Sequence, residues 1–284
     1  MSLLAVPNFS EGRDTSVIAA IRAALDRERG LLDRHSDAEH NRTVYTLTGD
    51  GRSLDELLAA AAAVAVERID MRRHRGLHPC IGALDVSPLV WLDEQGREPA
   101  TERARSVGEQ IAGLGVPVFL YGDLASSEQR RERAFFREGG LETLRQRMKA
   151  GELAPDLGPA IPHLSAGATL VTARPPLAAF NLELDTADAA VAQRVAAALR
   201  EAGGGPKGVR AIGLPLGDGR SQVSRTCTTR SRCLCESWSS GCGSSPSSSV
   251  PGRSRPRSSA WCRRRPFRAF RPTFRSAIST RSAM

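Results

Sequence analysis

The sequence changes character at residue 224, and this change limits the part of the chain that can fold. Residues 224–284 hold 29 Ser or Arg among 61 positions, with little apolar periodicity. Such a segment buries too little apolar surface to offset the entropy lost on ordering. We therefore expect an irregular, disordered tail at 224–284 and look for fold and function in residues 1–223.

Charge and cysteine content divide at the same place. The tail's 13 Arg and single acid, Glu236, give it a net charge of +12, which leaves −3 for residues 1–223 out of the total of +9. Five of the six cysteines lie in the tail, so the body, with Cys80 alone, fits a reducing compartment. The first residues do not read as a signal peptide, and no apolar run is long enough to span a bilayer. We expect a cytoplasmic protein without a membrane partner.

Two patterns of apolar residues alternate along residues 1–223, one typical of strands and one typical of helices. Strand-like apolar runs occupy residues 3–9, 41–49, 81–92, 116–122 and 168–184. Helical spacing of apolar residues marks residues 15–28, 53–70, 100–114, 126–150 and 187–202. Strands interleaved with helices of this length predict an α/β fold, an α+β sandwich in which helices cover a sheet.

Capping signals predict where two of these helices begin and end. Ser53 and Glu56 form a capping-box pattern, so the second helix is expected to begin at Ser53. Gly203 is expected at the C′ position that ends the last helix.

A boundary is expected near residue 174, where a Pro/Gly-rich loop is followed by an Arg-Pro-Pro sequence. The predicted organisation is one subdomain at 1–174, a second at 175–223 and the tail at 224–284.

Two histidines, His74 and His78, stand in a Gly/Pro-rich turn between a predicted helix and a predicted strand. A histidine at a strand entrance suits general-base chemistry because its pKa lies near neutrality; the alternative is an ordinary surface histidine. A metal pair at this spacing would need a helix, which Gly76 and Pro79 disfavour, so we expect no metal site. The residue types alone leave the first two interpretations open.

Several ordered blocks of the sequence resemble the glutamate formimidoyltransferase (formiminotransferase) family. They are VPNFSEGRD (6–14), HNRTVYTLTG (40–49), HRGLHPCIGALDV (74–86), VPVFLYG (116–122), PDLGP (155–159), GATLVTAR (167–174) and AFNLEL (179–184). The likeness is collinear from residue 4 to about residue 223, which makes it far more specific than any one motif.

The resemblance implies a folate enzyme of histidine degradation that transfers a formimidoyl group between N-formimidoyl-L-glutamate and tetrahydrofolate. It implies tetrahydrofolate as co-substrate, no metal and a homodimer. It also implies two ferredoxin-like βαββαβ subdomains joined near residue 174, the second of them incomplete in this chain. The alternatives are a formyltransferase acting on N-formyl-glutamate and an inactive truncated homologue.

The resemblance also assigns the proton-handling residues. The N5 amine of tetrahydrofolate must lose a proton as it attacks the amidine carbon, so a neutral base is required. His78, in the His-Pro dipeptide, takes this role by the family match. An acid in the loop before Asn-Arg-Thr is expected to orient it: Asp37 is the main candidate and Asp33 the alternative. Either acid could equally be a solvated loop residue.

Two glycine-rich segments match the family's folate-binding segments, where a backbone without Cβ atoms can approach a flat pterin. The first comprises Gly158, Pro159, Ala160, Ile161, Pro162, His163, Leu164, Ser165, Ala166 and Gly167. The second comprises Gly205, Pro206, Lys207, Gly208, Val209, Arg210, Ala211, Ile212 and Gly213. In the second, Lys207 and Arg210 would meet the carboxylates of the folate's glutamate tail. Without the resemblance, both would be ordinary flexible loops.

One position departs from the family pattern. The family usually has Arg after His-Pro, and this sequence has Cys80. Loss of that cation would weaken carboxylate binding or change the pKa of the base. Cys80 itself is expected to be a small hydrophobic thiol and not a nucleophile.

The tail has three competing explanations. A zinc site is disfavoured because its cysteines have no Cys-x-x-Cys spacing and it contains no histidine. An Arg-rich nucleic-acid-binding tail would give non-specific, salt-dependent affinity. The third explanation is translation in the wrong reading frame.

The frame explanation can be tested on the residues themselves. Shifted by one base with GC-rich codons, RTCTTRSRCLCESW rereads as roughly DLHDQVAVPLRVVE, and RSSAWCRRRPF as roughly AALVGLVPPAA. These resemble the helix and strand with which the family continues. We therefore interpret 224–284 as out of frame. Residues 175–223 are expected to form an incomplete sheet with an exposed edge, in a chain that is unstable and has little activity.

Overall fold

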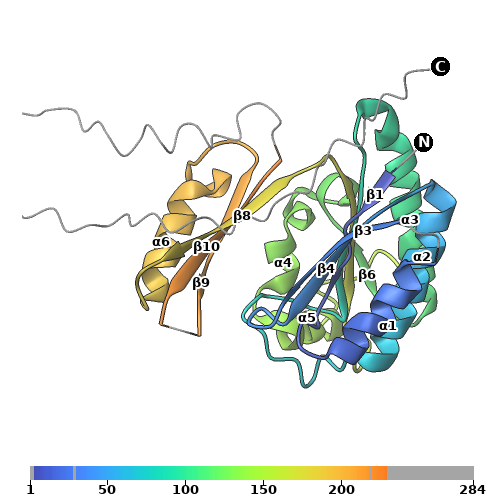
Figure 1. Cartoon of the computed structure of the whole chain (residues 1–284), viewed down its shortest axis with the longest axis horizontal. Coiled ribbons are helices and arrows are strands. Elements are labelled where there is room, and N and C mark those ends of the chain that lie inside the picture. The colour runs from blue at the N-terminus through green and yellow to red at the C-terminus, as the bar shows by residue number, and fades with distance from the viewer. Residues whose placement is uncertain (1–2, 28–29, 218, 229–284) are drawn as a thin grey trace, which may run out of the picture. The chain divides into compact units, whose positions relative to one another are not determined.

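The computed structural model describes residues 3–27, 30–217 and 219–228 (Figure 1). The chain divides into two compact units: Met1–Pro176 with Leu214–Gly219, and Leu177–Gly213 with the residues from Arg220 onward. The first unit ends two residues after the predicted boundary. The predictions of a disordered, out-of-frame and nucleic-acid-binding tail fall mostly on residues 229–284, which lie outside the described part of the chain.

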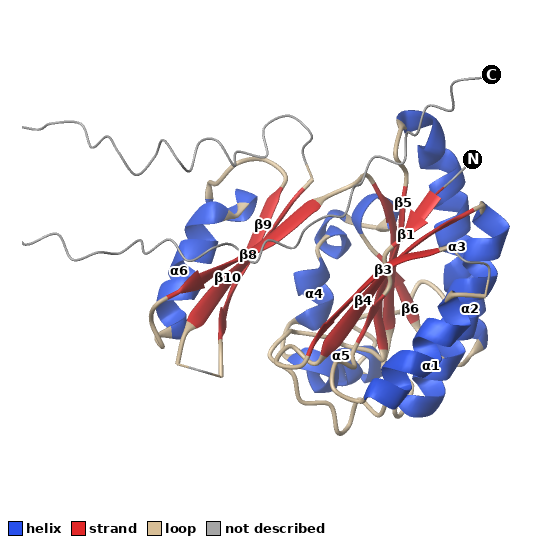
Figure 2. Cartoon of the chain, in the orientation of Figure 1, coloured by secondary structure: helices blue, strands red, loops and turns tan. Residues whose placement is uncertain are grey.

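The first unit is built on a seven-stranded sheet (Figure 2). Its strands are β1 (Leu3–Ala5), β2 (Asn8–Phe9), β3 (Leu31–Asp37), β4 (Arg42–Gly49), β5 (Leu84–Val90), β6 (Val118–Leu120) and β7 (Thr169–Arg174). Because β1 and β2 each pair with both β4 and β5, they act as two halves of one strand. The order across the sheet is β3-β4-β1/β2-β5-β7-β6, with β7 parallel to β5 and β6.

Helices cover both faces of this sheet. They are α1 (Thr15–Leu25), α2 (Gly51–Arg68), α3 (Arg97–Gly113), α4 (Arg133–Arg137) and α5 (Gly140–Lys149), with short 3₁₀ turns at Glu94–Gly96, Gly122–Leu124 and Glu128–Arg131. Apolar residues of α1, α2 and α3 form one core with the sheet, as at Ile21, Leu58 and Ile111. Those of α4 and α5, such as Phe136 and Leu144, form a second core on the other face. The predicted helical spacing matches the buried faces of α1, α2 and α3, whereas the helical region predicted at 126–150 is divided into a 3₁₀ turn, α4 and α5.

The topology confirms the predicted α+β sandwich. The order β3-β4-β1/β2-β5, with α1 and α2 as the two connections, is a βαββαβ arrangement, and β7 and β6 extend it. The loop predicted before Asn41 is confined to a short turn after Asp37, because β3 pairs with β4 from Leu31 to Asp37. An exposed edge strand lacks the apolar alternation that marks a half-buried one.

The second unit is smaller. It contains β8 (Ala178–Leu184), α6 (Ala189–Leu199), a 3₁₀ turn at Glu201–Gly203, β9 (Val209–Pro215) and β10 (Ser221–Cys227), with the sheet order β8-β10-β9. This is a βαββ arrangement, and neither β8 nor β9 has a second neighbouring strand among the described residues. Its buried core is made of small residues, chiefly Ala192, Ala196, Ala211 and Val223.

Two predictions about this unit need correction. The irregular tail was expected from residue 224, but β10 continues to Cys227, which pairs with Ala178 of β8. Gly203 was expected to end the helix, but α6 ends at Leu199, and the left-handed residue is Gly204, with φ of 87°. A 3₁₀ turn after α6 shifts the position that glycine must fill.

The start of α2 also differs from its predicted start, and the difference can be tested. The cap is Asp50, whose carboxylate accepts from the Ser53 amide at 2.9 Å; Ser53 itself lies inside the helix. We expect Asp50→Ala to lower the free energy of unfolding by about 0.5–2 kcal/mol, because an amide at the helix start loses its acceptor. Ser53→Ala is the matched control and should cost little. Urea unfolding of both variants checks this. A larger loss of stability from Ser53→Ala would support the capping box predicted from the sequence.

Candidate functional site

The segment between α2 and β5 holds both histidines of the predicted site. It contains no helix, as the glycine and proline content predicted. Its two ends are tied to the first glycine-rich segment: the Met71 amide donates to the Ser165 carbonyl at 2.7 Å, and the Ala83 amide to the Ala166 carbonyl at 2.8 Å. Gly82 is required here, since a Cβ atom would lie 1.9 Å from the Ala168 carbonyl oxygen.

The turn between β3 and β4 packs against the middle of this segment. The Leu77 amide donates to the Glu39 carbonyl at 3.2 Å, and a Cβ on Gly76 would lie 2.3 Å from the His40 carbonyl oxygen. Asn41 adopts a left-handed φ of 47°, which asparagine tolerates. Its Oδ1 accepts from the Gly12 amide at 2.9 Å and its Nδ2 lies 3.3 Å from His74 Nδ1. Asn41 thus joins three segments that are far apart in the sequence.

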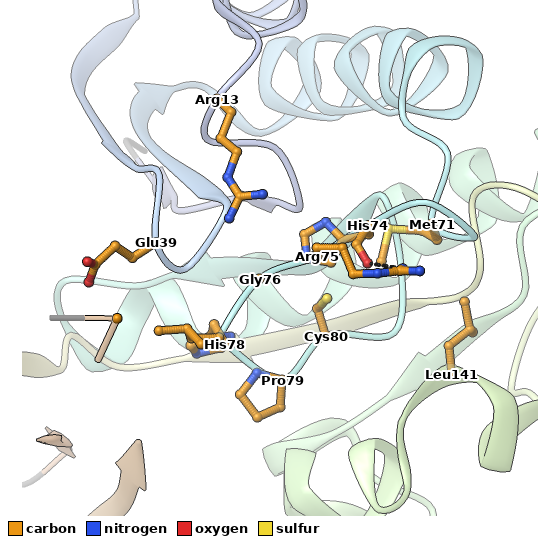
Figure 3. A pocket seen from close by; sticks show the side chains of 12 residues that line it. Arg13, Glu39, Met71, His74, Arg75, Gly76, His78, Pro79, Cys80 and Leu141 are labelled. Carbon is orange, nitrogen blue, oxygen red and sulfur yellow. Dashed lines mark hydrogen bonds between the residues drawn. The ribbon is translucent and has the colours of Figure 1, made fainter. Parts of the chain in front are cut away.

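A pocket of about 660 Å³ lies over this junction (Figure 3). Arg13 and Glu39 line it from the β2–α1 loop and the β3–β4 turn, and His74, His78 and Cys80 line it from the segment before β5. The volume is in the range of small-molecule sites. The structure therefore places His78 in a concave, ligand-sized site.

Asp37 does not hydrogen-bond to His78, and this part of the prediction is corrected. Its Oδ2 is 2.8 Å from Nδ1 of His40, and its Oδ1 accepts from the amides of Glu39 and His40 at 2.9 Å. These bonds, led by that with the His40 side chain, hold the pKa of Asp37 well below its usual range. The His40 and His78 rings meet edge to face, 6.2 Å between centroids. Asp37 therefore orients His40, which stands next to the predicted base.

Asp33, the alternative acid, lies in the middle of β3. It pairs with Thr46 of β4 and is exposed. Four residues along a strand separate it from Asp37 by roughly 13 Å.

The environment of His78 keeps its imidazole neutral. Burial, followed by the positive charges of Arg42, Arg137 and Arg133, holds the pKa of His78 well below its usual value. Its Nδ1 is buried and has no hydrogen-bond partner among the described residues. A neutral imidazole at physiological pH can accept a proton from a bound ligand.

Cys80 lies beside His78 as a half-buried thiol. Burial, together with the charge of Asp85, raises the pKa of Cys80 to about 12. The thiol therefore stays protonated near neutral pH, and it packs against the main hydrophobic core. This matches the expected hydrophobic thiol and argues against a nucleophile.

A buried ion pair stands next to these residues. Asp85, at the start of β5, accepts a hydrogen bond from Arg137 of α4, and both side chains are almost fully buried. Asp85 also accepts from the Ile81 amide at 2.9 Å. Arg137 is thus the cation that neutralises Asp85 beside Cys80.

The first glycine-rich segment lies at the edge of the site. Gly158 and Gly167 both have positive φ, and a tight turn joins His163 to Gly167 through two backbone hydrogen bonds. Ile161 and Leu164 expose 55% and 66% of their surface, so the turn presents two apolar side chains to solvent. The fold brings this segment next to the His78 segment, as the hydrogen bonds of Met71 and Ala83 show.

The second glycine-rich segment belongs entirely to the second unit, and its last five residues lie in β9. Val209 and Ala211 of β9 are buried in the core of that unit, whereas Lys207 and Arg210 are exposed. A Cβ on Gly213 would lie 2.3 Å from the Ala192 backbone, so this glycine permits close packing of β9 against α6. Lys207 and Arg210 are thus accessible to a ligand, as are Pro206 and Ile212.

Residue patterns missed several members of the site. His40, Arg42, Arg133 and Arg137 lie near His78, and Asp85 lies near Cys80. A usable signal existed for the first two, since polar His-Asn-Arg stands directly before a β-branched run. No sequence signal marked Arg133 and Arg137, which lie in a uniformly charged stretch.

The Asp37–His40 bond predicts a pH-dependent stability. Asp37→Asn keeps the acceptor for the two turn amides but loses the charge that binds His40. Because the folded-state pKa lies below the unfolded value of about 3.9, the charge stabilises the fold above that pH, and this contribution is lost as the pH falls. We expect Asp37→Asn to be less stable at pH 7 and the difference to shrink toward pH 3. Urea midpoints across that range check this; a gap that widens in acid would contradict it.

Within the described residues, no cluster of His, Cys, Asp and Glu could hold a metal ion. The helices there are too short or too polar to cross a membrane.

Comparison with known proteins gives a consistent result. Residues 2–174 match the model of the formiminotransferase domain, N-terminal subdomain. The chain is 40% identical to glutamate formimidoyltransferase of Streptococcus pyogenes serotype M1 over 232 residues, 80% of this chain and 78% of that protein. It is 36% identical to the glutamate formimidoyltransferase of Thermoplasma acidophilum over 225 residues, 77% of this chain and 74% of that protein. Against the formimidoyltransferase-cyclodeaminase of Sus scrofa it is 42% identical over 217 residues but spans only 40% of that longer protein.

Proposed function

Because the chain belongs to the formiminotransferase family, we propose that it transfers a formimidoyl group between N-formimidoyl-L-glutamate and tetrahydrofolate. The relatives named glutamate formimidoyltransferase support this activity. The observation that carries it is His78, a histidine kept neutral by burial in a ligand-sized pocket.

The reaction needs one proton removed and one delivered. The N5 nitrogen of tetrahydrofolate attacks the amidine carbon, so an N5–C bond forms and the bond from that carbon to the glutamate nitrogen breaks. N5 loses a proton and the glutamate nitrogen gains one. His78 takes the proton from N5 as general base, and its protonated form returns a proton to the leaving amine.

The positions of the substrates follow from the same proposal. The pterin lies against the first glycine-rich segment, Gly158–Gly167, whose apolar Ile161 and Leu164 offer a surface for a flat ring. Lys207 and Arg210 bind the carboxylates of the folate tail. We also propose that the protein is cytoplasmic and forms a homodimer. Light scattering, which gives the molar mass in solution, tests the dimer.

Turnover tests the proposed activity directly. The protein is mixed with N-formimidoyl-L-glutamate and tetrahydrofolate, and the 5,10-methenyl product is followed through an added cyclodeaminase. A parallel assay with N-formyl-L-glutamate distinguishes a formyltransferase. Absence of tetrahydrofolate binding by calorimetry, in a protein with the C-terminal reading frame restored, would overturn the proposal.

A further inference from the structure

Arg42 is a positively charged residue near His78 that forms no ion pair with any described residue. It is the first residue of β4 and is half-buried. Its guanidinium makes no hydrogen bond or ion pair with any described residue, and none of its nitrogens is among the polar atoms sealed from solvent. Burial lowers the pKa of Arg42 to about 10, so the group is still charged at neutral pH.

The carboxylates near Arg42 are already bound to other side chains. Asp85 is the carboxylate whose charge most favours ionised Arg42, but it is already bound to Arg137. Arg133 and Arg137 are also close enough to disfavour a further positive charge, and Asp37, which favours it, is bound to His40. A partly buried guanidinium costs free energy unless an anion pairs with it. The geometry therefore suits an incoming carboxylate.

Arg42 is also next to the base. It follows the His40–Asn41 turn directly, and the His40 ring meets the His78 ring edge to face, 6.2 Å between centroids. The positive charge of Arg42 is one of the causes that lower the pKa of His78. A ligand bound to Arg42 through a carboxylate therefore places the atoms next to that carboxylate near His78.

Two ligands of the proposed function carry glutamate carboxylates, and they differ in how far those carboxylates lie from the reacting atoms. In N-formimidoyl-L-glutamate the α-carboxylate and the nitrogen that leaves are attached to the same carbon atom. In tetrahydrofolate the p-aminobenzoyl group separates the glutamate tail from the reacting N5. We propose that Arg42 binds the α-carboxylate of the formimidoyl donor and so presents its amidine carbon to the nucleophile beside His78. This inference rests on the proposed function.

The test measures the affinity of the frame-restored protein for each substrate separately. Calorimetry with N-formimidoyl-L-glutamate should show a dissociation constant that is roughly 10- to 100-fold higher for Arg42→Gln than for the wild type, because a charge-assisted hydrogen bond is lost. Arg42→Lys keeps the charge without the planar fork and should lose less. Affinity for tetrahydrofolate should stay within about two-fold in both variants. Arg105→Gln, at an exposed arginine of α3 with no ion pair to a described residue, is the matched control and should change neither affinity.

Thermal unfolding separates a binding role from a structural one. Because Arg42 has no protein partner among the described residues, Arg42→Gln should leave Tm unchanged or raise it. A lower Tm with unchanged donor affinity would overturn the inference, as would an equal loss of donor and folate affinity. A wild-type chain that binds tetrahydrofolate but not the donor would overturn the inference alone. A frame-restored protein that binds neither substrate would overturn the proposed function and this inference with it.

Discussion

Restoring the reading frame after Ser224 is expected to turn an aggregation-prone chain with little activity into a stable, active transferase. The second unit has the order β8-β10-β9 with one helix, which is the βαββ part of a ferredoxin-like unit. In that topology a fourth strand, which the described residues do not include, pairs with the first, here β8. The shifted frame supplies an apolar helix and strand in place of Ser and Arg, so it would close the sheet and cover its open face.

Three proteins make this test decisive. The unaltered chain, the frame-restored protein and a chain ending at Thr228 are compared by light scattering, Tm and turnover. The shortened chain removes the Arg-rich residues but keeps the open β8 edge, so we expect it to remain inactive and prone to associate. If shortening alone restored activity, the positive charge of the tail, and not the open β8 edge, would be the cause of the low activity.

Two outcomes would contradict the frame interpretation. One is full transferase activity of the unaltered chain. The other is a gene whose frame is intact across codons 215–235 and shared with close relatives. Sequence-specific RNA binding that depends on the tail and survives physiological salt would give the tail a function of its own.

Replacing His78 with Ala is expected to lower turnover by about 10²- to 10⁴-fold, which is the usual contribution of a general base. The side chain lines the pocket, and its pKa is held low by burial and by nearby arginines, so it is neutral when the N5 proton must leave. Folate binding should be largely unchanged, because the pterin surface is assigned to a different segment. Stability should also change little, since the buried Nδ1 of His78 has no partner among the described residues.

The measurement is turnover of the frame-restored protein with both substrates saturating, together with calorimetry for tetrahydrofolate. His35→Ala, at an exposed histidine of β3, is the matched control and should keep wild-type turnover. Turnover of His78→Ala within about two-fold of wild type would remove His78 from the mechanism. A loss confined to folate affinity would make it a binding residue.

The sequence by itself determined the secondary structure wherever one face of an element is buried. Helix α1 and strands β4 and β7 appear where the apolar period placed them, because burial of one face imposes that period on the residues. It also determined the family and the candidate base, since ordered blocks and a His-Pro turn are properties of the chain in one dimension. The sequence did not predict strand β3, because the strand lies exposed at the sheet edge and its register comes from pairing with β4.

Only the tertiary structure decided which side chains of the site contact one another. Asp37 binds His40 and not His78 because the β3–β4 turn folds back over three residues, a conformation that spacing does not reveal. Arg42, Asp85 and Arg137 come from β4, β5 and α4, and the packing of α4 on the sheet brings them together. Their charges act on His78 through space, so the pKa of the base and the unneutralised cation beside it depend on distances and burial that no one-dimensional pattern contains.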